Sequence, residues 1–392
     1  MTEQAKVPAI RFAGFTDPWE QRKFSNLTDR VSMQSSDPDL PQVEYEDIVS
    51  GEGTLNKDLR DKEGGKTGIK FYAGDVLYGK LRPYLMNWLY PQFNGVAVGD
   101  FWVLRATECD SSFLYRLVQT DSFQRLANVS SGSKMPRADW NLISQSFFAV
   151  PADYAEQRVI AKSLAELDDL ITLHQRKYDK LVIFKKSMLE KMFPKDGESV
   201  PEIRFAGFTD PWEQRKASEV FQIVDDRGHP TLPVLSATQN QGMIYRDDSG
   251  RYIGHDESNE IGYKRVLPGD FVVHLRSFQG GFAHSQYEGI TSPAYTVFRA
   301  KEPTSHSDRF WKHWFMSEHF IAGLSTVTYG IRDGRSISVD EFMNTFLAFP
   351  AVEEQAAISR LFDYLDDLIT LHQRKLELLQ NIKKSLLDKM FV

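Results

Sequence analysis

Basic and amide side chains stand beside glycine or aromatic residues in predicted loops of both halves of this 392-residue sequence. Arginine and lysine can hydrogen-bond guanine in the major groove, glutamine can pair with adenine, and serine or tyrosine can hold a phosphate. These residue types indicate DNA binding, although each could instead be a solvated surface charge or part of a structural ion pair. The candidate DNA-binding residues are Lys80, Arg82, Tyr84, Ser133, Lys134 and Arg137 in the first half, and Arg276, Ser277, Gln279, Tyr329, Arg332 and Arg335 in the second.

The patterns expected of an enzyme are missing from the sequence. Gly64-Gly-Lys-Thr67 is similar to part of a phosphate-binding loop, but Arg60 occupies the place of its first glycine, so a flexible turn is the better interpretation. The nine histidines contain no His-Glu-x-x-His pattern, and the single cysteine, Cys109, excludes a cysteine-rich metal site. We find no glycine-rich S-adenosylmethionine loop and no Asn-Pro-Pro-Phe or Asp-Pro-Pro-Tyr motif. We therefore expect no catalytic residue, no cofactor and no metal.

Two long helices must position the loops. The sequence from Leu167 to Lys177 returns unchanged from Leu365 to Lys375. Around both copies, seam residues alternate at spacings of four and three; all are apolar except His174 and Lys185 in the first copy and His372 and Lys383 in the second. That spacing is the a/d seam of a coiled coil. The apolar seam positions are Ile160, Leu164, Leu167, Ile171, Tyr178, Leu181, Met188 and Met192 in the first copy, and Ile358, Phe362, Leu365, Ile369, Leu376, Leu379, Leu386 and Met390 in the second.

The charges of the two helices favour an antiparallel pairing. In a parallel pair in register, the acidic pairs would face each other and so would the lysine pairs. In an antiparallel pair with Ile160 beside Met390, Asp168 comes level with Lys383 and Asp366 with Lys185, so both repulsions become attractions. The alternative is that these acids are simply solvated.

The chain is a tandem duplication. The segment 7–23 reappears almost unchanged as 200–216, so each half consists of this repeated motif, a variable globular part and a long helix. We predict an α+β fold in which two similar domains are separated by two long helices that form an antiparallel coiled coil with pseudo-two-fold symmetry. The predicted boundaries are residues 1–152, 153–193, 194–350 and 351–392, that is, first domain, first helix, linker with second domain, and second helix.

The variable parts share a predicted order of elements although their residues differ. Turn-strand signals occur at 73–77 and 268–272, and further strands are predicted at 101–106 and 295–300. Aromatic-rich helical stretches follow at 113–126 and 310–324, and an apolar strand ends just before each long helix. Asp153 and Glu156 have the spacing of a capping box at the start of the first long helix.

Composition sets broader limits. The formal net charge is −7, so any positive DNA-binding surface must be local or be supplied by a partner. The residues at the N-terminus contain no apolar export core, and no apolar run approaches the roughly 18 residues of a membrane span. With one cysteine, these features predict a cytoplasmic protein.

The duplicated order of motifs resembles the specificity subunit of type I restriction-modification systems over nearly the whole chain. The motifs that carry the resemblance are Arg11–Trp19 and its duplicate Arg204–Trp212, Gly79–Tyr84, Leu275–Gly281, Tyr329–Ser336 and the Leu-Asp-Asp-Leu-Ile copies in the helices. The resemblance implies that each variable part is a target-recognition domain for one half of a two-part, asymmetric DNA target. It also implies that the helices set the spacing and dock two modification (methyltransferase) subunits, with restriction subunits as further partners, and that DNA methylation and cleavage belong to those partners.

Four leucines outside the seam widen the apolar face of the two helices, as docking helices require. They are Leu170, Leu173, Leu368 and Leu371, which could instead cover the underside of the recognition domains.

Two rival functions remain open. One is a coiled-coil scaffold whose globular ends bind proteins, and the other is a self-sufficient DNA methyltransferase, for which the sequence offers no cofactor loop.

Overall fold

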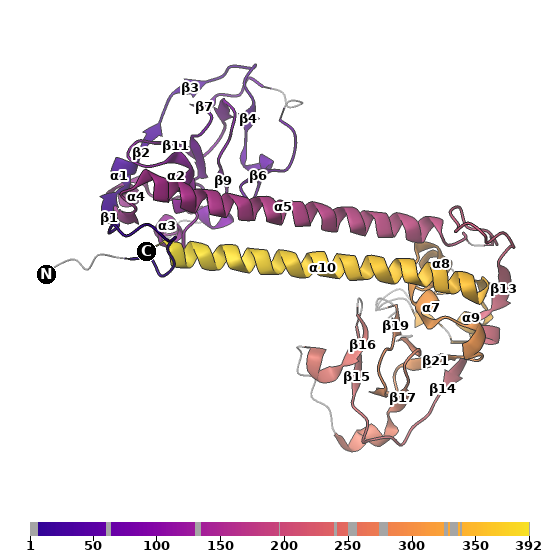
Figure 1. The fold of residues 1–392 in the computed structure, drawn as a ribbon. Helices are drawn as coiled ribbons and strands as arrows, with labels where there is room; N and C mark the ends of the chain where they lie inside the picture. Colours follow the sequence, from indigo (N-terminus) through magenta and orange to yellow (C-terminus); the bar gives the residue numbers. More distant parts are fainter. Residues whose placement is uncertain are drawn as a thin grey trace. The chain divides into compact units, whose positions relative to one another are not determined.

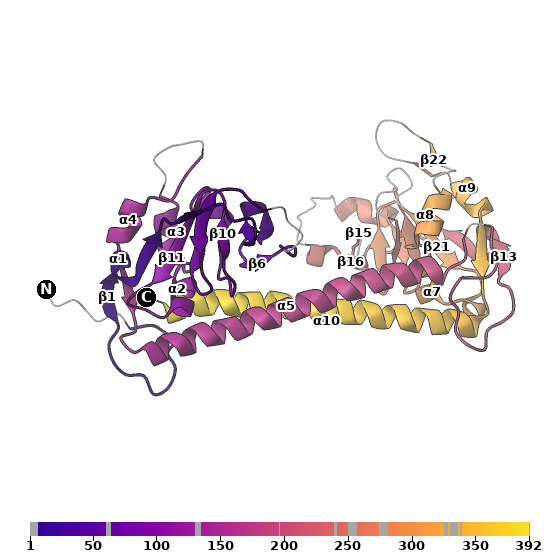
Figure 2. The same ribbon diagram turned by 90° about the horizontal axis from the view of Figure 1, so that it is seen from above.

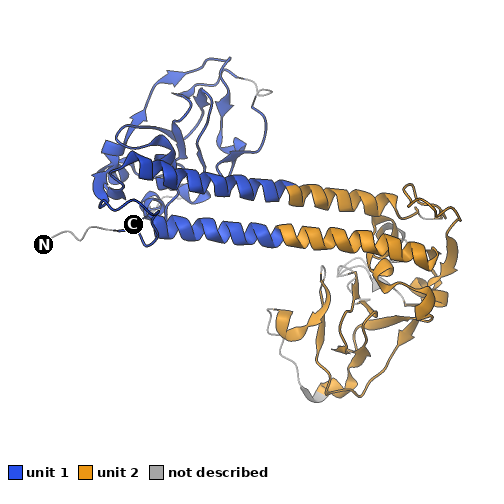
Figure 3. Ribbon diagram, viewed as in Figure 1, with its two compact units in different colours: residues 1–176, 373–392 blue, residues 177–372 orange. Residues whose placement is uncertain are grey.

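The computed structural model describes residues 7–59, 64–129, 135–195, 197–238, 241–249, 257–273, 281–324, 328–329, 336–337 and 339–391. The chain divides into two compact units (Figure 3). Unit 1 comprises residues 1–176 and 373–392, and unit 2 comprises residues 177–372. Both units combine β-sheets with α-helices, which confirms the predicted mixed α/β class.

The two longest helices are α5 (Tyr154–Lys191) and α10 (Val352–Met390), and each contributes one end to each unit (Figures 1 and 3). Within unit 1 their two segments lie side by side in both ribbon views (Figures 1 and 2), and Lys383 Nζ is 2.6 Å from Asp168 Oδ1. Within unit 2, Lys185 Nζ is 2.5 Å from Asp366 Oδ1. These are the two ion pairs that the sequence predicts for antiparallel helices.

The start of α5 differs from the predicted capping box. Asp153 does act as a cap, because its Oδ1 accepts a hydrogen bond from the Ala155 amide at 2.7 Å. Glu156, however, is buried and its carboxylate binds Arg11 and Trp19 from the N-terminal segment. The capping-box prediction for Glu156 was therefore wrong, because a distant arginine outcompetes the local backbone amide for its carboxylate.

Unit 1 is built on two four-stranded sheets, with the strand orders β2-β11-β8-β9 and β3-β7-β10-β4, and on the pairs β1-β12 and β5-β6. Its strands are β1 (Glu20–Lys23), β2 (Thr28–Val31), β3 (Gln34–Ser35), β4 (Gln42–Val43), β5 (Ile48–Val49), β6 (Thr54–Leu55), β7 (Gly68–Phe71), β8 (Val76–Gly79), β9 (Trp88–Leu89), β10 (Gly95–Ala97), β11 (Phe101–Ala106) and β12 (Phe147–Val150). Its shorter helices are α1 (Phe24–Leu27), α2 (Ser111–Leu117), α3 (Asp121–Ala127) and α4 (Trp140–Gln145), with 3-10 turns η1 (Tyr45–Asp47) and η2 (Pro83–Leu85).

Unit 2 repeats the first of these sheets with the strand order β14-β21-β18-β19, together with the pairs β13-β24, β15-β16, β17-β20 and β22-β23. Its strands are β13 (Glu213–Lys216), β14 (Phe221–Val224), β15 (Leu235–Thr238), β16 (Gly242–Tyr245), β17 (Lys264–Val266), β18 (Phe271–Val273), β19 (Phe282–His284), β20 (Gly289–Thr291), β21 (Thr296–Ala300), β22 (Thr328–Tyr329), β23 (Ser336–Ile337) and β24 (Phe346–Phe349). Its shorter helices are α6 (Ala217–Val220), α7 (Asp308–Trp314), α8 (Glu318–Leu324) and α9 (Val339–Asn344), with 3-10 turns η3 (Arg246–Ser249), η4 (Glu257–Gly262) and η6 (Pro303–Ser305).

Aromatic residues fill the main core of each unit, where sheet, short helices and long helices meet. In unit 1, Phe24, Phe113 and Phe123 are fully buried in one cluster that also contains Leu164 of α5 and Met390 of α10. In unit 2 the matching cluster includes the fully buried side chains Phe193, Phe221, Phe310, Trp311 and Phe362. Each such side chain stabilises its unit by about 2 kcal/mol through burial. The long helices are therefore part of both cores.

Two predicted helical stretches are each split into two helices. In the first, α2 ends before Val118 and α3 restarts at Asp121, because the Thr120 hydroxyl accepts a hydrogen bond from the Phe123 amide at 3.4 Å and caps the new helix. The second stretch likewise divides into α7 and α8. Among the described residues, no helix combines the length and the apolar character that crossing a bilayer requires.

Candidate nucleic-acid interface

The loop that follows β8 carries three of the predicted DNA-binding residues of unit 1. Its backbone is fastened to the segment around Arg137, since the Arg82 amide donates to Pro136 O at 2.7 Å and the Ala138 amide donates to Lys80 O at 2.8 Å. Leu81 and Arg137 also form an isolated antiparallel bridge. The fold thus brings together Lys80, Arg82, Tyr84 and Arg137, which lie up to 57 residues apart (137 − 80) in the sequence.

Two of these cations are partly neutralised by one acid. Arg137 Nη2 is 2.9 Å from Asp100 Oδ2, and Lys80 Nζ is 3.5 Å from Asp100 Oδ1. Burial of Asp100 acts to raise its pKa, but the hydrogen bond and charge of Arg137, together with Lys80, outweigh burial, so the pKa lies below its ordinary value. The carboxylate therefore stays ionised and holds both cations at the loop. A phosphate could replace it as the partner of either one.

Arg82 and Tyr84 are exposed, and among the described residues the Arg82 guanidinium has no ion-pair partner. Tyr45 links the loop to the segment around Asp100, because its hydroxyl donates to Asp100 O at 2.5 Å and accepts from the Leu81 amide at 3.1 Å. Burial raises the pKa of the Tyr45 hydroxyl to about 12, so it remains a donor at neutral pH. The arrangement presents an exposed guanidinium and an exposed phenol on a fixed backbone, as contacts to bases or phosphates require.

The other eight predicted DNA-binding residues are Tyr329 and seven residues outside the described part of the chain. Only the backbone of Tyr329 is described, as the end of strand β22, which pairs with β23. Ser133 and Lys134 of the first half, and Arg276, Ser277, Gln279, Arg332 and Arg335 of the second half, lie outside the described residues.

The predicted docking leucines lie on the long helices. Leu170 and Leu173 on α5 are exposed in unit 1, and Leu371 on α10 is exposed in unit 2, whereas Leu368 is half-buried. Three of the four are therefore not covered by the unit to which they belong. An exposed leucine row on a helix is the kind of surface against which another helix packs.

Each unit contains a clamp that the sequence did not predict. In unit 1, Arg11 donates to both carboxylate oxygens of Glu156 at 2.6 and 2.8 Å, and the Trp19 indole donates to the same carboxylate at 3.3 Å. The repeated motif thus binds the first turn of α5. The arginine and the tryptophan of this motif occur in both halves of the sequence, and in both halves a Glu-Gln pair stands at the start of the long helix. This shared recurrence is a sequence signal from which the clamp could have been predicted.

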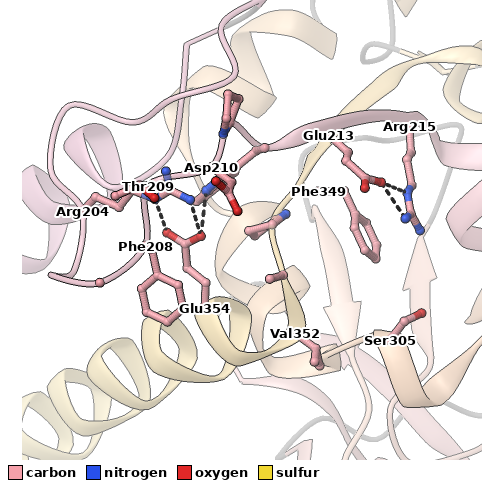
Figure 4. Close-up of a pocket in the computed structure, with 15 residues that line it drawn as sticks. Arg204, Phe208, Thr209, Asp210, Glu213, Arg215, Ser305, Phe349, Val352 and Glu354 are labelled. Atoms are coloured by element: carbon pink, nitrogen blue, oxygen red, sulfur yellow. Dashed lines mark hydrogen bonds and ion pairs between the residues drawn. The ribbon is translucent and has the colours of Figure 1, made fainter.

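Unit 2 repeats the clamp at the start of α10 (Figure 4). Arg204 donates to Glu354 at 2.7 and 2.8 Å, and the Trp212 indole donates at 3.0 Å. A cavity of about 400 Å³ adjoins it, lined by Arg204, Gly207, Phe208, Thr209, Asp210, Pro211, Trp212, Glu213, Arg215, Ser305, Phe349, Pro350, Ala351, Val352 and Glu354. Two charged pairs in this lining, Arg204 with Glu354 and Arg215 with Glu213, already neutralise each other. The clamp is therefore a structural joint beside the cavity.

One side-chain cluster in unit 2 has the composition of a metal site. Ligand atoms of His313, Asp363 and Asp366 lie within 4.8 Å of one another. However, Lys312 Nζ is 3.8 Å from Asp363 and 3.4 Å from Asp366, and Lys185 is 2.5 Å from Asp366. These ammonium groups occupy the carboxylates and would repel a divalent cation. The cluster is an ion-pair network that joins α7 to the long helices.

The fold has counterparts among solved structures. The type I restriction-modification system S subunit from M. genitalium matches with a TM-score of 0.59 and 11% sequence identity, over 99% of both chains. A chain from a structure that describes complex assembly and conformational transition of the type I R-M system matches with a TM-score of 0.51 and 17% identity, over 95% of this chain and 97% of the other. The fold is therefore similar to that of a type I restriction-modification S subunit.

The sequence comparisons agree with the fold. The chain is 24% identical over 298 residues to the type I restriction enzyme MjaVIII specificity subunit of Methanocaldococcus jannaschii, covering 71% of this chain and 68% of that protein. It is 27% identical over 155 residues to the type I restriction enzyme EcoDI specificity subunit of Escherichia coli, covering 38% and 34% of the two proteins. No family model matches the chain. The resemblance to type I specificity subunits predicted from the motifs is confirmed.

Proposed function

We propose that this chain is the DNA-specificity subunit of a type I restriction-modification complex. One observation carries the proposal: the two units repeat the same central sheet order and the same helix clamp, while their loop residues differ. A common framework with divergent loops fits two readers of two different sequences. Each unit then recognises one half of a two-part, asymmetric DNA target.

We assign a function to each of the four predicted segments of the chain. Residues 1–152 and 194–350 are the first and second target-recognition domains, the latter with its linker, and 153–193 and 351–392 are the spacer helices. As an antiparallel coiled coil with pseudo-two-fold symmetry, the helices set the distance between the half-sites. The ion pairs of Asp168 with Lys383 and of Asp366 with Lys185 support this pairing.

The twelve predicted loop residues are the proposed DNA contacts. Lys80 and Arg137 are suited to phosphate, because both already bind an anionic group, the Asp100 carboxylate. Arg82 is suited to a base edge or a phosphate, because it is exposed on a fixed backbone. We expect no chemistry from the chain itself.

The proposed partners are double-stranded DNA, two copies of the modification subunit and the restriction subunits, in the cytoplasm. The identical stretch in both helices offers the same surface twice, which fits two copies of one partner. Leu170, Leu173, Leu368 and Leu371 are the proposed docking residues, supported by the exposure of three of them. The rival scaffold function uses the same leucines but requires no DNA contact.

The test is methylation-sensitive sequencing of DNA from cells that express this chain with a cognate modification subunit, compared with cells that express the modification subunit alone. A new two-part motif with methylated adenine supports the proposal and gives the target and its spacing. If both proteins are present and associated but no motif appears, the scaffold function replaces it.

A second measurement concerns the net charge of −7. The isolated chain should bind its target weakly, and tight, salt-sensitive binding should require the modification subunits, because these must supply most of the phosphate-neutralising charge. Equal affinity of the chain with and without those subunits contradicts this expectation.

A further inference from the structure

The 3-10 turn η2 in unit 1 and the residue that follows it carry three consecutive large side chains that are exposed. Tyr84 is 54% exposed, Leu85 is 38% exposed and Met86 is 42% exposed. Pro83 at the start of the turn is buried and anchors it. An exposed tyrosine, leucine and methionine in a row cost solubility without adding to the core, which suggests that a partner covers them.

The backbone of this turn is held in a conformation that most residues avoid. Arg82 has φ 50° and Met86 has φ 53°, and among the described residues they are the two non-glycine residues with positive φ. Strain of this kind persists where the surroundings enforce it, and it concentrates at binding sites. The turn is therefore built into one shape before any partner arrives.

Hydrogen bonds from two sides enforce that shape. On one side the Arg82 amide donates to Pro136 O at 2.7 Å. On the other, the Gly51 amide donates to Met86 O at 3.0 Å and the Ser50 hydroxyl donates to Leu85 O. Within the turn, the Leu85 amide donates to Arg82 O at 2.9 Å. Because these backbone groups already have partners in the protein, the tip can enter an apolar space without leaving them unpaired.

The cations beside the turn favour nucleic acid as its partner. Arg82 begins the turn and its guanidinium has no ion-pair partner among the described residues, while Lys80 and Arg137 share Asp100 as their acid. Among the described residues, these three cations and one acid belong to the loop and to the segment bonded to it on one side, while the acid Glu52 follows Gly51 on the other side. A DNA duplex offers the matching surface, with phosphates on the outside and stacked apolar base faces between them.

We propose that the turn at residues 82–86 is an apolar wedge whose Leu85 and Met86 side chains enter a base step in the half-site read by unit 1. This inference rests on the proposed DNA-recognition function. Arg82 holds the flanking phosphate, and Tyr84 stacks on an exposed base face or sugar at the rim of the opened step. Proteins that insert leucine, methionine or proline between base pairs unstack and kink the duplex at that step.

The second half of the sequence lacks the same side chains. Where the first half has Arg82-Pro-Tyr-Leu-Met86, the matching motif of the second half reads Arg276-Ser-Phe-Gln-Gly280. Neither leucine nor methionine follows its arginine. The leucine-methionine wedge therefore belongs to the first half of the chain, and the second half has Phe278 in its place.

The experiment uses the full chain in complex with the modification subunit, on the duplex target that methylation sequencing defines. 2-Aminopurine is placed in turn at each step of both half-sites except the methylated adenine, which methyltransferases extrude themselves. Wild-type complex should raise the fluorescence several-fold at one step of one half-site. The L85A/M86A variant should lose that rise and bind about tenfold more weakly.

Two controls separate the explanations. Leu142→Ala removes an exposed leucine from α4 of the same unit and should behave as wild type. A mismatch at the opened step should tighten wild-type binding and reduce the deficit of the double variant, because the cost of unstacking is lower there.

Two outcomes overturn the wedge while leaving the proposed function in place. One is a double variant that retains both the fluorescence rise and the affinity. The other is a double variant that no longer assembles with the modification subunit, which makes the turn a protein contact. If the wild-type complex recognises no two-part target, the proposed function fails, and the wedge fails with it.

Discussion

In unit 1 the Asp75 carboxylate accepts two hydrogen bonds from Arg105, at 2.8 and 2.7 Å, and in unit 2 Asp270 accepts two from Arg299 at the same distances. Both pairs join the strand-entry turn to the neighbouring central strand. The clamps at the starts of α5 and α10 match equally well. What the two units share is thus a set of charged contacts that fix strands and helices to one another.

The units differ in the side chains that the short helices place beside Asp168 of α5 and Asp366 of α10. In unit 1, Arg116 on α2 donates to Asp168 at 2.5 Å and carries a permanent charge. In unit 2, Asp366 lies 3.4 Å from Lys312 on α7, with His313 beside it. Burial lowers the pKa of His313, so this histidine is neutral at neutral pH. The long helices are alike, but the domains packed on them carry different charges.

The largest expected effect tests whether the two clamps are equivalent. Glu156→Ala and Glu354→Ala should each destabilise their own unit by about 3 kcal/mol, because each leaves a largely buried arginine without its acid. Hydrogen exchange monitored by mass spectrometry, peptide by peptide, gives the loss in each unit separately.

The glutamine variants at the same positions are the matched controls, since they keep the side-chain volume and part of the hydrogen bonding. They should cost less than the alanine variants. If one alanine variant is neutral while the other is severe, the clamps are alike in geometry but not in energy, and the symmetry of the framework is broken.

A pH difference between the units is the next largest effect. His306 precedes α7 and Cys109 precedes α2 at the same place in each unit, and both are largely buried. Burial lowers the pKa of His306 to about 4 and raises the pKa of Cys109 to about 12. Both groups are therefore neutral at pH 7, but only the histidine gains a proton on mild acidification of the unfolded chain.

Because the folded pKa of His306 is depressed, its neutral form stabilises unit 2 above pH 6.5, and that stability is lost as the pH falls toward 4. At pH 5 the loss should be about 2 kcal/mol in unit 2. His306→Phe should remove the part of the dependence that His306 causes and leave the part caused by the buried His313, while keeping the ring that stacks on Trp311. Hydrogen exchange at pH 7 and pH 5, corrected for intrinsic rates, measures it. An equal loss in unit 1 would show that the histidine is not the cause.

The smallest effect concerns the ion pairs between the long helices. Lys383→Met should weaken unit 1 and Lys185→Met should weaken unit 2, each by about 1 kcal/mol, because a partly exposed ion pair gains little over solvated charges. Double-mutant cycles with Asp168→Asn and Asp366→Asn give the two coupling energies. A coupling of zero in both units would mean that these pairs contribute nothing to the proposed antiparallel pairing.

Local sequence patterns predicted much of the fold. The strand expected at 101–106 is β11 (Phe101–Ala106), and the strand expected at 295–300 is β21 (Thr296–Ala300). The residues with heptad spacing lie in or next to α5 and α10. The positions of the acidic and lysine pairs in the sequence predicted the ion pairs between these helices. These succeeded because helix and strand periodicity is written in neighbouring residues.

Three features escaped prediction, each for a physical reason. The stretch after β11 was predicted as one helix, but Thr120 caps a second helix inside it. Glu156 was assigned to a local cap, although Arg11 takes its carboxylate. The positive φ of Arg82 and Met86 gave no signal, because sequence marks such positions mainly through glycine.

The sequence by itself determined that this protein is a duplication with two heptad-patterned helices, because repeats and periodicity require no knowledge of distant contacts. Tertiary structure alone decided that Arg11 meets Glu156 across 145 residues, and that Lys80 and Arg137 share Asp100. Many acids and bases could satisfy such pairings equally well in the extended chain. Packing of the aromatic cores leaves few of them within reach, and those few form the clamps and the candidate DNA-binding loop.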